Sequence, residues 1–241
     1  MAAATGFTVL PAIDVKSGKS VRLSKGDLKQ SSSEVDPLEV ALEFQQIGAK
    51  WIHLVDLDLA FGMGYNTELL TKIVGSVNMK VQVSGGIKDE ESFNRALSTG
   101  CQRINISCAA IEDFDWLESK LQRNEIEISI ALDIDADQVK PRGSKKVVGQ
   151  LWAILEKLDY AGCNRYSITD VNRDGNLKGP NLELLSSIAQ RTNKPLIASG
   201  GIASVADLVS LQQISSVDGA IVGKALYTGA MELSDALAVC R

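Results

Sequence analysis

The sequence predicts an α/β protein, a single (β/α)8 or TIM barrel built from two repeated half-barrels. Eight apolar runs alternate with eight segments of helical pattern along the 241 residues, and no linker separates them. Several of these runs are apolar throughout, which is typical of parallel strands covered by helices. In addition, Val83-Ser84-Gly85-Gly86-Ile87 returns as Ala198-Ser199-Gly200-Gly201-Ile202, 115 positions later.

Further landmarks recur at nearly the same spacing. Three pairs lie 114, 116 and 119 residues apart, respectively: Asp56 with Asp170, Ile106-Ser107-Cys108 with Val222-Gly223-Lys224, and Asp14 with Asp133. Because the offset stays within a few residues, we interpret the chain as an internal repeat. We expect one domain over residues 1–241, with half-repeats at about 8–122 and 123–239.

Each expected strand ends at a polar residue or a glycine, or is followed directly by an aspartate. The strands are predicted near 8–13, 51–56, 80–84, 103–107, 127–132, 165–169, 195–199 and 219–223. The helices are predicted at 37–47, 66–74, 89–98, 113–121, 149–160, 181–190, 204–212 and 232–239. Pro37 suits a first helical position, and Asn66 and Asn181 suit N-caps. Gly48 and Gly162 follow helix ends, where a left-handed residue is favoured.

Composition excludes several classes of function. The net charge of −5 gives no basic surface for nucleic acid, and no apolar run approaches the ~20 residues that span a bilayer. Cys101, Cys108, Cys163 and Cys240 lack CxxC spacing, which favours reduced, buried thiols in a cytoplasmic protein. His53 is the only histidine, so a zinc site is not expected. We expect a monomer that binds neither nucleic acid nor membrane.

The two Ser-Gly-Gly segments predict phosphate sites. Two glycines after a strand let the backbone turn sharply and expose its N–H groups, and the following helix directs its positive end to the same place. For one copy alone, a tight turn without a ligand is the favoured explanation of the pattern. Two copies in register favour a pair of phosphate-binding turns, which we call the first cradle (after strands 3 and 4) and the second cradle (after strands 7 and 8).

Asp14 and Asp133 are the leading candidates for chemistry. They end strands 1 and 5, which face each other across the mouth of an eight-stranded barrel, where active sites lie. The two cradles are also opposite each other. This arrangement suits a long substrate with a phosphate at each end and reacting atoms in the middle. Two carboxylates there can divide into base and acid, although either aspartate alone could simply bind a neighbouring amide.

Five other residues have both a functional and a structural interpretation. Arg22 and Arg142 lie in polar loops after strands 1 and 5, where each could neutralise substrate charge or be solvated. His53, within strand 2, could face the substrate or serve as a structural histidine. Thr169 ends strand 6, and Asp174 belongs to an Asp-Gly pair that most often marks a turn.

Six segments resemble the phosphoribosyl isomerase A family of histidine-biosynthesis barrels. They are LPAIDVKSGKSVRL, IHLVDLDLAFG, VSGGIKDEES, ITDVNRDGNLKGPN, IASGGI and GAIVGKALY, and the resemblance extends from about residue 8 to the C-terminus. It implies isomerisation of the bisphosphate N′-((5′-phosphoribosyl)formimino)-5-aminoimidazole-4-carboxamide ribonucleotide (ProFAR) from an aminoaldose to an aminoketose. This reaction is an Amadori rearrangement that needs no metal or organic cofactor.

The resemblance also implies roles for individual residues. Asp14 corresponds to the base at C2′ and Asp133 to the acid that helps to open the ribose ring, with Asp174 as a rival for the acid. The implied substrate contacts are Arg22, His53, Ser84, Arg142 and Thr169. The implied phosphate contacts are Gly85, Gly86, Ser107 and Cys108 in the first cradle and Gly179, Gly201, Gly223 and Lys224 in the second.

Ser84 before Gly-Gly and the VDLDLAFG segment resemble the actinobacterial branch, which also isomerises phosphoribosylanthranilate in tryptophan biosynthesis. Ser107-Cys108 replaces a Gly-Thr pair that is usual in that branch. Arg142-Gly143-Ser144-Lys145-Lys146 lacks the tryptophan that usually follows in this loop. One activity or both therefore remain as alternatives. Two further alternatives are the related cyclase that forms imidazole glycerol phosphate and a non-catalytic barrel that binds phosphorylated metabolites.

Overall fold

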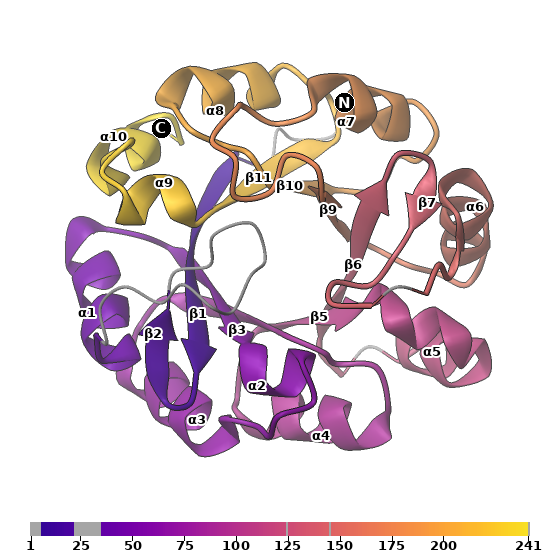
Figure 1. Cartoon of the computed structure of the whole chain (residues 1–241), viewed down its shortest axis with the longest axis horizontal. Coiled ribbons are helices and arrows are strands. Elements are labelled where there is room, and N and C mark those ends of the chain that lie inside the picture. The colour runs from indigo at the N-terminus through magenta and orange to yellow at the C-terminus, as the bar shows by residue number, and fades with distance from the viewer. Residues whose placement is uncertain (1–5, 22–34, 124, 145, 241) are drawn as a thin grey trace.

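The chain forms a closed barrel of eight parallel strands (Figure 1). The computed structural model describes residues 6–21, 35–123, 125–144 and 146–240. The barrel strands are β1 (Thr8–Lys16), β3 (Trp51–Asp56), β4 (Lys80–Ser84), β5 (Arg103–Ser107), β6 (Glu127–Asp135), β9 (Tyr166–Asp170), β10 (Leu196–Ser199) and β11 (Val217–Val222). The parallel β5–β6 pairing links the two half-chains on one side of the barrel, and the β1–β11 pairing links them on the other. The predicted fold is confirmed.

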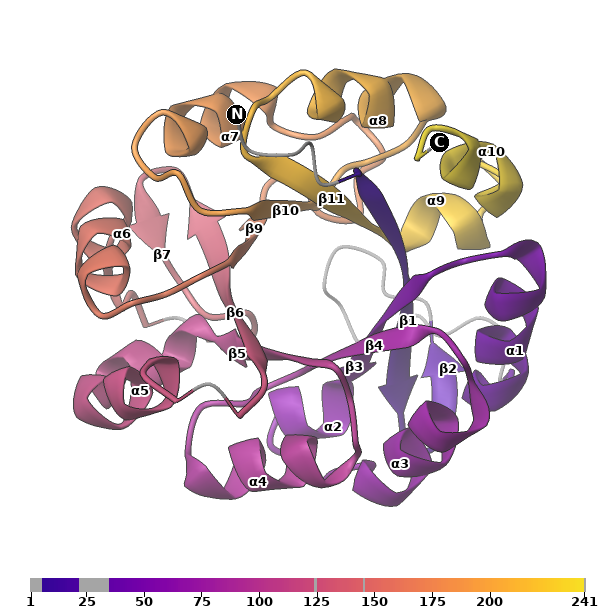
Figure 2. The same ribbon diagram turned by 180° about the vertical axis from the view of Figure 1, so that it is seen from behind.

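Helices surround the barrel, as the views from both ends show (Figures 1 and 2). They are α1 (Pro37–Ile47), α3 (Thr67–Ser76), α4 (Glu90–Ser98), α5 (Phe114–Leu121), α6 (Leu151–Tyr160), α7 (Leu182–Ala189), α8 (Val205–Gln212) and α10 (Leu233–Ala238). The main core lies between strands and helices, where residues such as Ile52, Ile130 and Leu117 are fully buried. Burial on the outer face of every strand explains why the strands are largely apolar. None of the helices in the described ranges combines the length and the apolar character needed to cross a membrane.

Short elements follow the carboxyl ends of several strands. They are β2 (Lys19–Val21), α2 (Leu57–Ala60), the 3₁₀-helix η1 (Cys108–Glu112), β7 (Gln138–Val139), β8 (Gly149–Gln150) and α9 (Lys224–Tyr227). β2 folds back antiparallel on β1, and β7 folds back on β6. The loops after the first and fifth barrel strands therefore begin as hairpins at the same end of the barrel.

Most predicted caps have the expected geometry, but two local predictions were wrong. Asn181 accepts a hydrogen bond from the Leu184 N–H at 3.0 Å, and Gly48 is left-handed with φ 108°. Asn66, however, makes no side-chain cap, because its Oδ1 accepts from the Gly18 N–H at 3.1 Å, while its NH₂ group donates to Asp56 and Asp58. Gly149 was expected to begin a helix, but it pairs with β7 as part of β8.

The barrel interior differs from the outer core. A small separate cluster of Leu10, Ala12, Ile197 and Ile221 packs inside the barrel. The end opposite the mouth is closed by ion pairs that link Arg103 and Arg165 to Glu127, and Arg165 to Asp218. Inward-facing positions alternate along each strand, so the residue two before a strand-end residue lies one layer deeper. Residues two positions before the strand ends, such as Asn105, therefore form a deeper layer inside the barrel.

Candidate active site

A cavity of about 1020 Å³ opens at the carboxyl ends of the barrel strands. Each of the eight strands contributes a lining residue within two positions of its end: Asp14, Val55, Ser84, Ser107, Asp133, Thr169, Ser199 and Gly223. Seven of these were expected from the sequence. For β3 the expected Asp56 is instead buried, with its carboxylate accepting from the Leu59 and Asn66 N–H groups, and Val55 lines the cavity.

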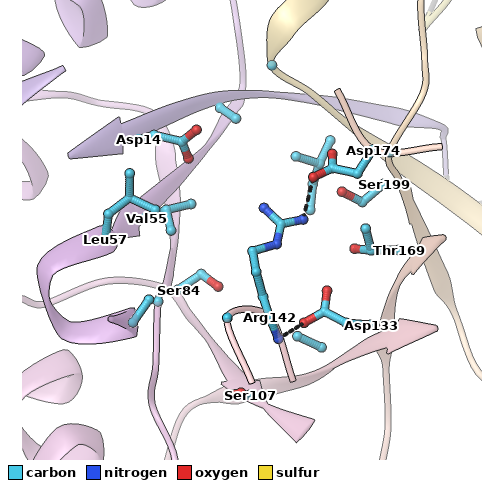
Figure 3. Close-up of a pocket in the computed structure, with 18 of the residues that line it drawn as sticks. Asp14, Val55, Leu57, Ser84, Ser107, Asp133, Arg142, Thr169, Asp174 and Ser199 are labelled. Carbon is cyan, nitrogen blue, oxygen red and sulfur yellow. Dashed lines mark hydrogen bonds and ion pairs between the residues drawn. The ribbon is translucent and has the colours of Figure 1, made fainter. Parts of the chain in front are cut away.

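Asp14 and Asp133 line the same cavity from opposite sides (Figure 3). Around the barrel the strand order is β1, β3, β4, β5, β6, β9, β10, β11, so β6 lies four strands from β1 in either direction. By the same count, β4 lies opposite β10, and β5 opposite β11. The two carboxylates therefore define one diameter of the mouth, and the two glycine cradles define another.

The Asp14 carboxylate has no hydrogen-bond partner within the described part of the chain. Burial raises the pKa of its carboxyl from 3.8 to about 6, and Asp174 contributes to the rise while Arg142 opposes it. A carboxylate with a raised pKa is a better proton acceptor than an ordinary aspartate and is still mostly ionised at neutral pH. The position has the properties of a general base.

Asp133 and Asp174 are connected through Arg142, which lies between them and Asp14 (Figure 3). The Arg142 backbone N–H donates to Asp133 Oδ2 at 3.2 Å, and its Nη2 lies 2.7 Å from Asp174 Oδ2. Burial raises the pKa of Asp133, while the Arg142 charge lowers it. The three carboxylates hold the pKa of Arg142 above its usual value, so it stays charged. Thr169 is the register partner of Asp133 on β9 and also lines the cavity.

In the first cradle, the glycines fit tightly against the segment after β3. Gly85 and Gly86 have φ values of 108° and 67°, and a Cβ on Gly86 would lie 2.7 Å from the Ala60 Cα. A Cβ on Gly85 would collide with the Asp56 backbone. No hydrogen bond within the described residues uses the Gly86 N–H. The glycines are thus required by packing as well as by any ligand.

The two residues of the Ser107-Cys108 turn have different positions relative to this cradle. Ser107 lines the cavity, and its hydroxyl accepts from the Ala109 N–H at 3.2 Å, which leaves its own proton free to be donated. The Cys108 side chain is fully buried in the core and does not line the cavity. The Cys108 thiol therefore packs in the core, and the contact of this residue with phosphate stays a prediction. Burial raises the pKa of this thiol.

The second cradle contains a lysine. Gly201, Gly223 and Lys224 line the cavity, and Lys224 Nζ donates to the Gly175 carbonyl at 2.7 Å. Gly201 has φ 80°, and its carbonyl accepts from the Gly179 N–H at 2.9 Å. Gly179 lies outside the cavity lining, and its N–H is already used. Gly179 thus supports the turn through this hydrogen bond, and its direct contact with phosphate stays a prediction.

His53 lies on the cavity floor, where Gln82 Nε2 donates to its Nδ1 at 2.9 Å. Burial and the charges of Arg142 and Arg103 lower the pKa of His53 to about 3. Arg22, the remaining predicted contact, lies outside the described residues. Within the described ranges, no three His, Cys, Asp or Glu residues gather as they would around a metal ion.

Sequence reasoning missed two polar residues inside the barrel. Asn105 lines the cavity and donates to Ser84 Oγ at 3.1 Å, but its Oδ1 is buried without a partner among the described residues. Gln82 is fully buried beneath His53. The period-2 alternation of side chains in a strand could have indicated both residues. Gln82 and Asn105 stand two positions before the predicted site residues Ser84 and Ser107, so they face the same side of their strands.

Comparison with known proteins agrees with this geometry. Residues 8–232 match a family described as "Histidine biosynthesis protein". Relatives named 1-(5-phosphoribosyl)-5-((5-phosphoribosylamino)methylideneamino)imidazole-4-carboxamide isomerase include one from Frankia alni, 49% identical over 233 residues, which cover 97% of this chain and 95% of the relative. The relative of that name from Thermobifida fusca is 49% identical over 235 residues, covering 97% and 96%.

A relative from Mycobacteroides abscessus is named "Phosphoribosyl isomerase A", and it is 46% identical over 238 residues, covering 96% of this chain and 98% of the relative. The family match and these relatives each extend over nearly the whole described barrel, including both cradles and both strand-end aspartates. The chain therefore belongs to the histidine biosynthesis protein family.

Proposed function

We propose that the protein binds ProFAR, the compound in the names of the relatives, in this cavity and isomerises it from its aminoaldose to its aminoketose form. The observation that carries this proposal is the crossed arrangement of two carboxylates and two glycine cradles around one cavity. A substrate with a phosphate at each end would span the cradles and bring its middle between Asp14 and Asp133. Binding energy from the remote phosphates then positions the reacting atoms.

The chemistry requires one acid and one base. Asp133 donates a proton to the ring oxygen of the phosphoribosyl group as the bond between C1′ and that oxygen breaks, which leaves a protonated imine. Asp14 removes the proton from C2′, and the resulting enolamine rearranges to the aminoketose when C1′ is protonated and the C2′ hydroxyl proton is lost. Atoms and electrons balance without an oxidant, because substrate and product are isomers.

The electrostatics support this division of roles. Asp14, with a pKa of about 6, is ionised at neutral pH and accepts a proton readily. Burial favours the protonated form of Asp133, as an acid requires. Arg142 stays positively charged between the carboxylates, where it can balance negative charge that develops on the substrate.

The proposal extends to phosphoribosylanthranilate as a weaker second substrate. That compound carries one phosphate, so it would use only one of the two cradles and lose the binding energy of the other. The loop after β6 supplies no tryptophan beside Arg142 to stack on an anthranilate ring. We expect turnover of this substrate to have a lower kcat/KM than turnover of ProFAR.

The direct test is to assay the purified protein with ProFAR alongside its Asp14→Asn variant. We expect conversion by the unchanged protein and a loss of about 10²–10⁴-fold or more in kcat in the variant, because the base is removed without change of shape. Asp115→Asn, on the exposed outer surface of α5, is the matched control and should keep full activity. An Asp14→Asn variant that keeps most of the rate would refute the assigned base.

The same assay separates the alternatives. Turnover of the aminoketose with ammonium salts, without turnover of ProFAR, would identify a cyclase. Tight binding of ProFAR without turnover would identify a binding protein that has lost catalysis.

A further inference from the structure

The only histidine of the chain is held by a buried line of hydrogen bonds that leads away from the cavity. Arg103 Nη1 donates to Gln82 Oε1 at 3.0 Å, and Gln82 Nε2 contacts His53 Nδ1 at 2.9 Å. Gln82 is 0% exposed and Arg103 6% exposed, so water cannot replace either contact freely. The three residues lie on the adjacent strands β3, β4 and β5.

Arg103 is itself fixed in place. Its Nε lies 2.9 Å from Glu127 Oε1, and its guanidinium stacks over the Trp51 ring with 4.1 Å between the guanidinium carbon and the ring centroid. An arginine held by an ion pair at one edge and a ring at its face keeps its Nη1–H directed at Gln82.

These contacts have one consistent assignment of protons. A guanidinium can only donate, so the Gln82 carbonyl oxygen must face Arg103. The Gln82 NH₂ group, which also can only donate, must then face His53. Nδ1 of His53 therefore accepts and carries no proton, and the ring proton sits on Nε2. Nε2 has no hydrogen-bond partner among the described residues, although His53 lines the cavity.

We propose that Arg103 and Gln82 are positioning residues that lock His53 as the Nε2–H tautomer, so that the cavity floor presents a hydrogen-bond donor and not a base. The ligand group it meets is an acceptor, such as a ribose oxygen of the substrate. The nature of that ligand rests on the proposed isomerase function, whereas the tautomer lock does not.

The charges around His53 support a ring that stays neutral. Arg103 lies beyond Gln82 on one side and Arg142 lies over the cavity on the other, and both oppose a second proton on the imidazole. The nearest anionic group in the strand register is Asp14 on the neighbouring strand β1. It lies two residues beyond Ala12, which is the residue that pairs with His53. Burial outweighs its attraction, since the pKa of His53 falls to about 3. The His53 ring is therefore expected to stay neutral near pH 7.

Nuclear magnetic resonance tests the lock without any substrate. Because His53 is the only histidine, protein labelled with ¹⁵N in histidine gives one pair of ring signals, whose positions and couplings identify the protonated nitrogen. We expect protonated Nε2 and unprotonated Nδ1 from about pH 5 to about pH 8, a range in which an ordinary histidine titrates. A protonated Nδ1 in the unchanged protein would overturn the proposal.

Gln82→Glu is the decisive variant because it keeps the shape and reverses the hydrogen bond. The new carboxylate would pair with Arg103 and accept from His53, so Nδ1 should gain a proton. Ser129→Ala is the matched control, because it removes a buried 3.0 Å contact with Ser167 inside the barrel without touching His53, and it should leave the ring signals unchanged. Identical ring signals in Gln82→Glu and in the unchanged protein would overturn the lock.

The functional part is tested by kinetics on the same variants, with thermal melting to verify that both are folded. We expect Gln82→Glu to lower kcat/KM with ProFAR by about 10–100-fold, the usual effect of altering a residue that orients a site side chain. A changed tautomer with unchanged kcat/KM would overturn the positioning role. If the unchanged protein does not turn over ProFAR, the proposed function fails, and the spectra alone still decide whether the lock exists.

Discussion

The two halves of the barrel share a backbone plan but distribute charge differently. In the first half the Asp14 carboxylate faces the cavity without a hydrogen-bond partner in the described residues, whereas in the second half Asp133 and Asp174 are both bound by Arg142. Equivalent strand-end positions have thus acquired different environments. Since a carboxyl group takes its proton affinity from its surroundings, such a difference is what allows one aspartate to act as base and another as acid.

The cradles differ in the same way. The first presents the Ser107 hydroxyl and the second presents the Lys224 ammonium group. Their glycines also pack against unlike partners, since Gly86 meets Ala60 of α2 and Gly201 meets Gly179 of the loop after β9. A Ser-Gly-Gly turn is therefore required by packing in both halves, and its presence alone does not show that phosphate binds there.

The largest expected effect concerns the acid in the second half. Asp133→Asn should lower kcat with ProFAR by about 10²–10⁴-fold, because the ring-opening proton is lost. Asp174→Asn should act mainly on KM, because it releases Arg142 from a 2.7 Å ion pair and leaves the acid in place. Steady-state kinetics on both variants check this assignment. The reverse order of kcat effects would transfer the acid role to Asp174.

A smaller effect should distinguish the two cradles. Lys224→Met should raise KM for ProFAR about tenfold or more, because it removes a positive charge from the second cradle. A tenfold change corresponds to about 1.4 kcal/mol of binding free energy. Ser107→Ala should change KM less, but it should lower the free energy of unfolding by about 1 kcal/mol through loss of the cap on Ala109. Kinetics combined with urea denaturation measures both. Equal KM effects would show that the cradles contribute alike.

The last expected effect is on stability and not on kinetics, and it concerns Asp14 alone. Its folded pKa of about 6 lies above the value of 3.8 for an unperturbed carboxyl, so ionisation of this group disfavours the folded state. Asp14→Asn should therefore raise the free energy of unfolding by about 3 kcal/mol at pH 7, because each pKa unit corresponds to about 1.4 kcal/mol. The gain should be complete above about pH 6 and vanish below about pH 4, as the carboxyl becomes neutral in both states. Denaturation at a series of pH values checks it, and a gain independent of pH would contradict the assigned cause.

The order of the elements could be predicted because each depends on local pattern. All eight barrel strands and their helices occur where apolar runs and capping residues indicated, and Asn181 caps α7 as expected. Asn66 has the same local pattern, but its Oδ1, the atom that would cap the helix, accepts instead from the Gly18 N–H of the hairpin after β1 at 3.1 Å. A cap is predictable only where no tertiary partner competes for the side chain.

The sequence alone determined the barrel, the opposed aspartates and the positions of both glycine turns, because strand ends in a closed parallel barrel converge on one mouth. Tertiary structure decided which polar groups are free. The Cys108 side chain is buried in the core, and the Gly179 N–H donates to the Gly201 carbonyl. Arg142 lies among three carboxylates, and Arg103 and Gln82 form a line of hydrogen bonds to His53. These outcomes depend on contacts between strands that are distant along the chain, and local periodicity does not specify which donors and acceptors such contacts consume.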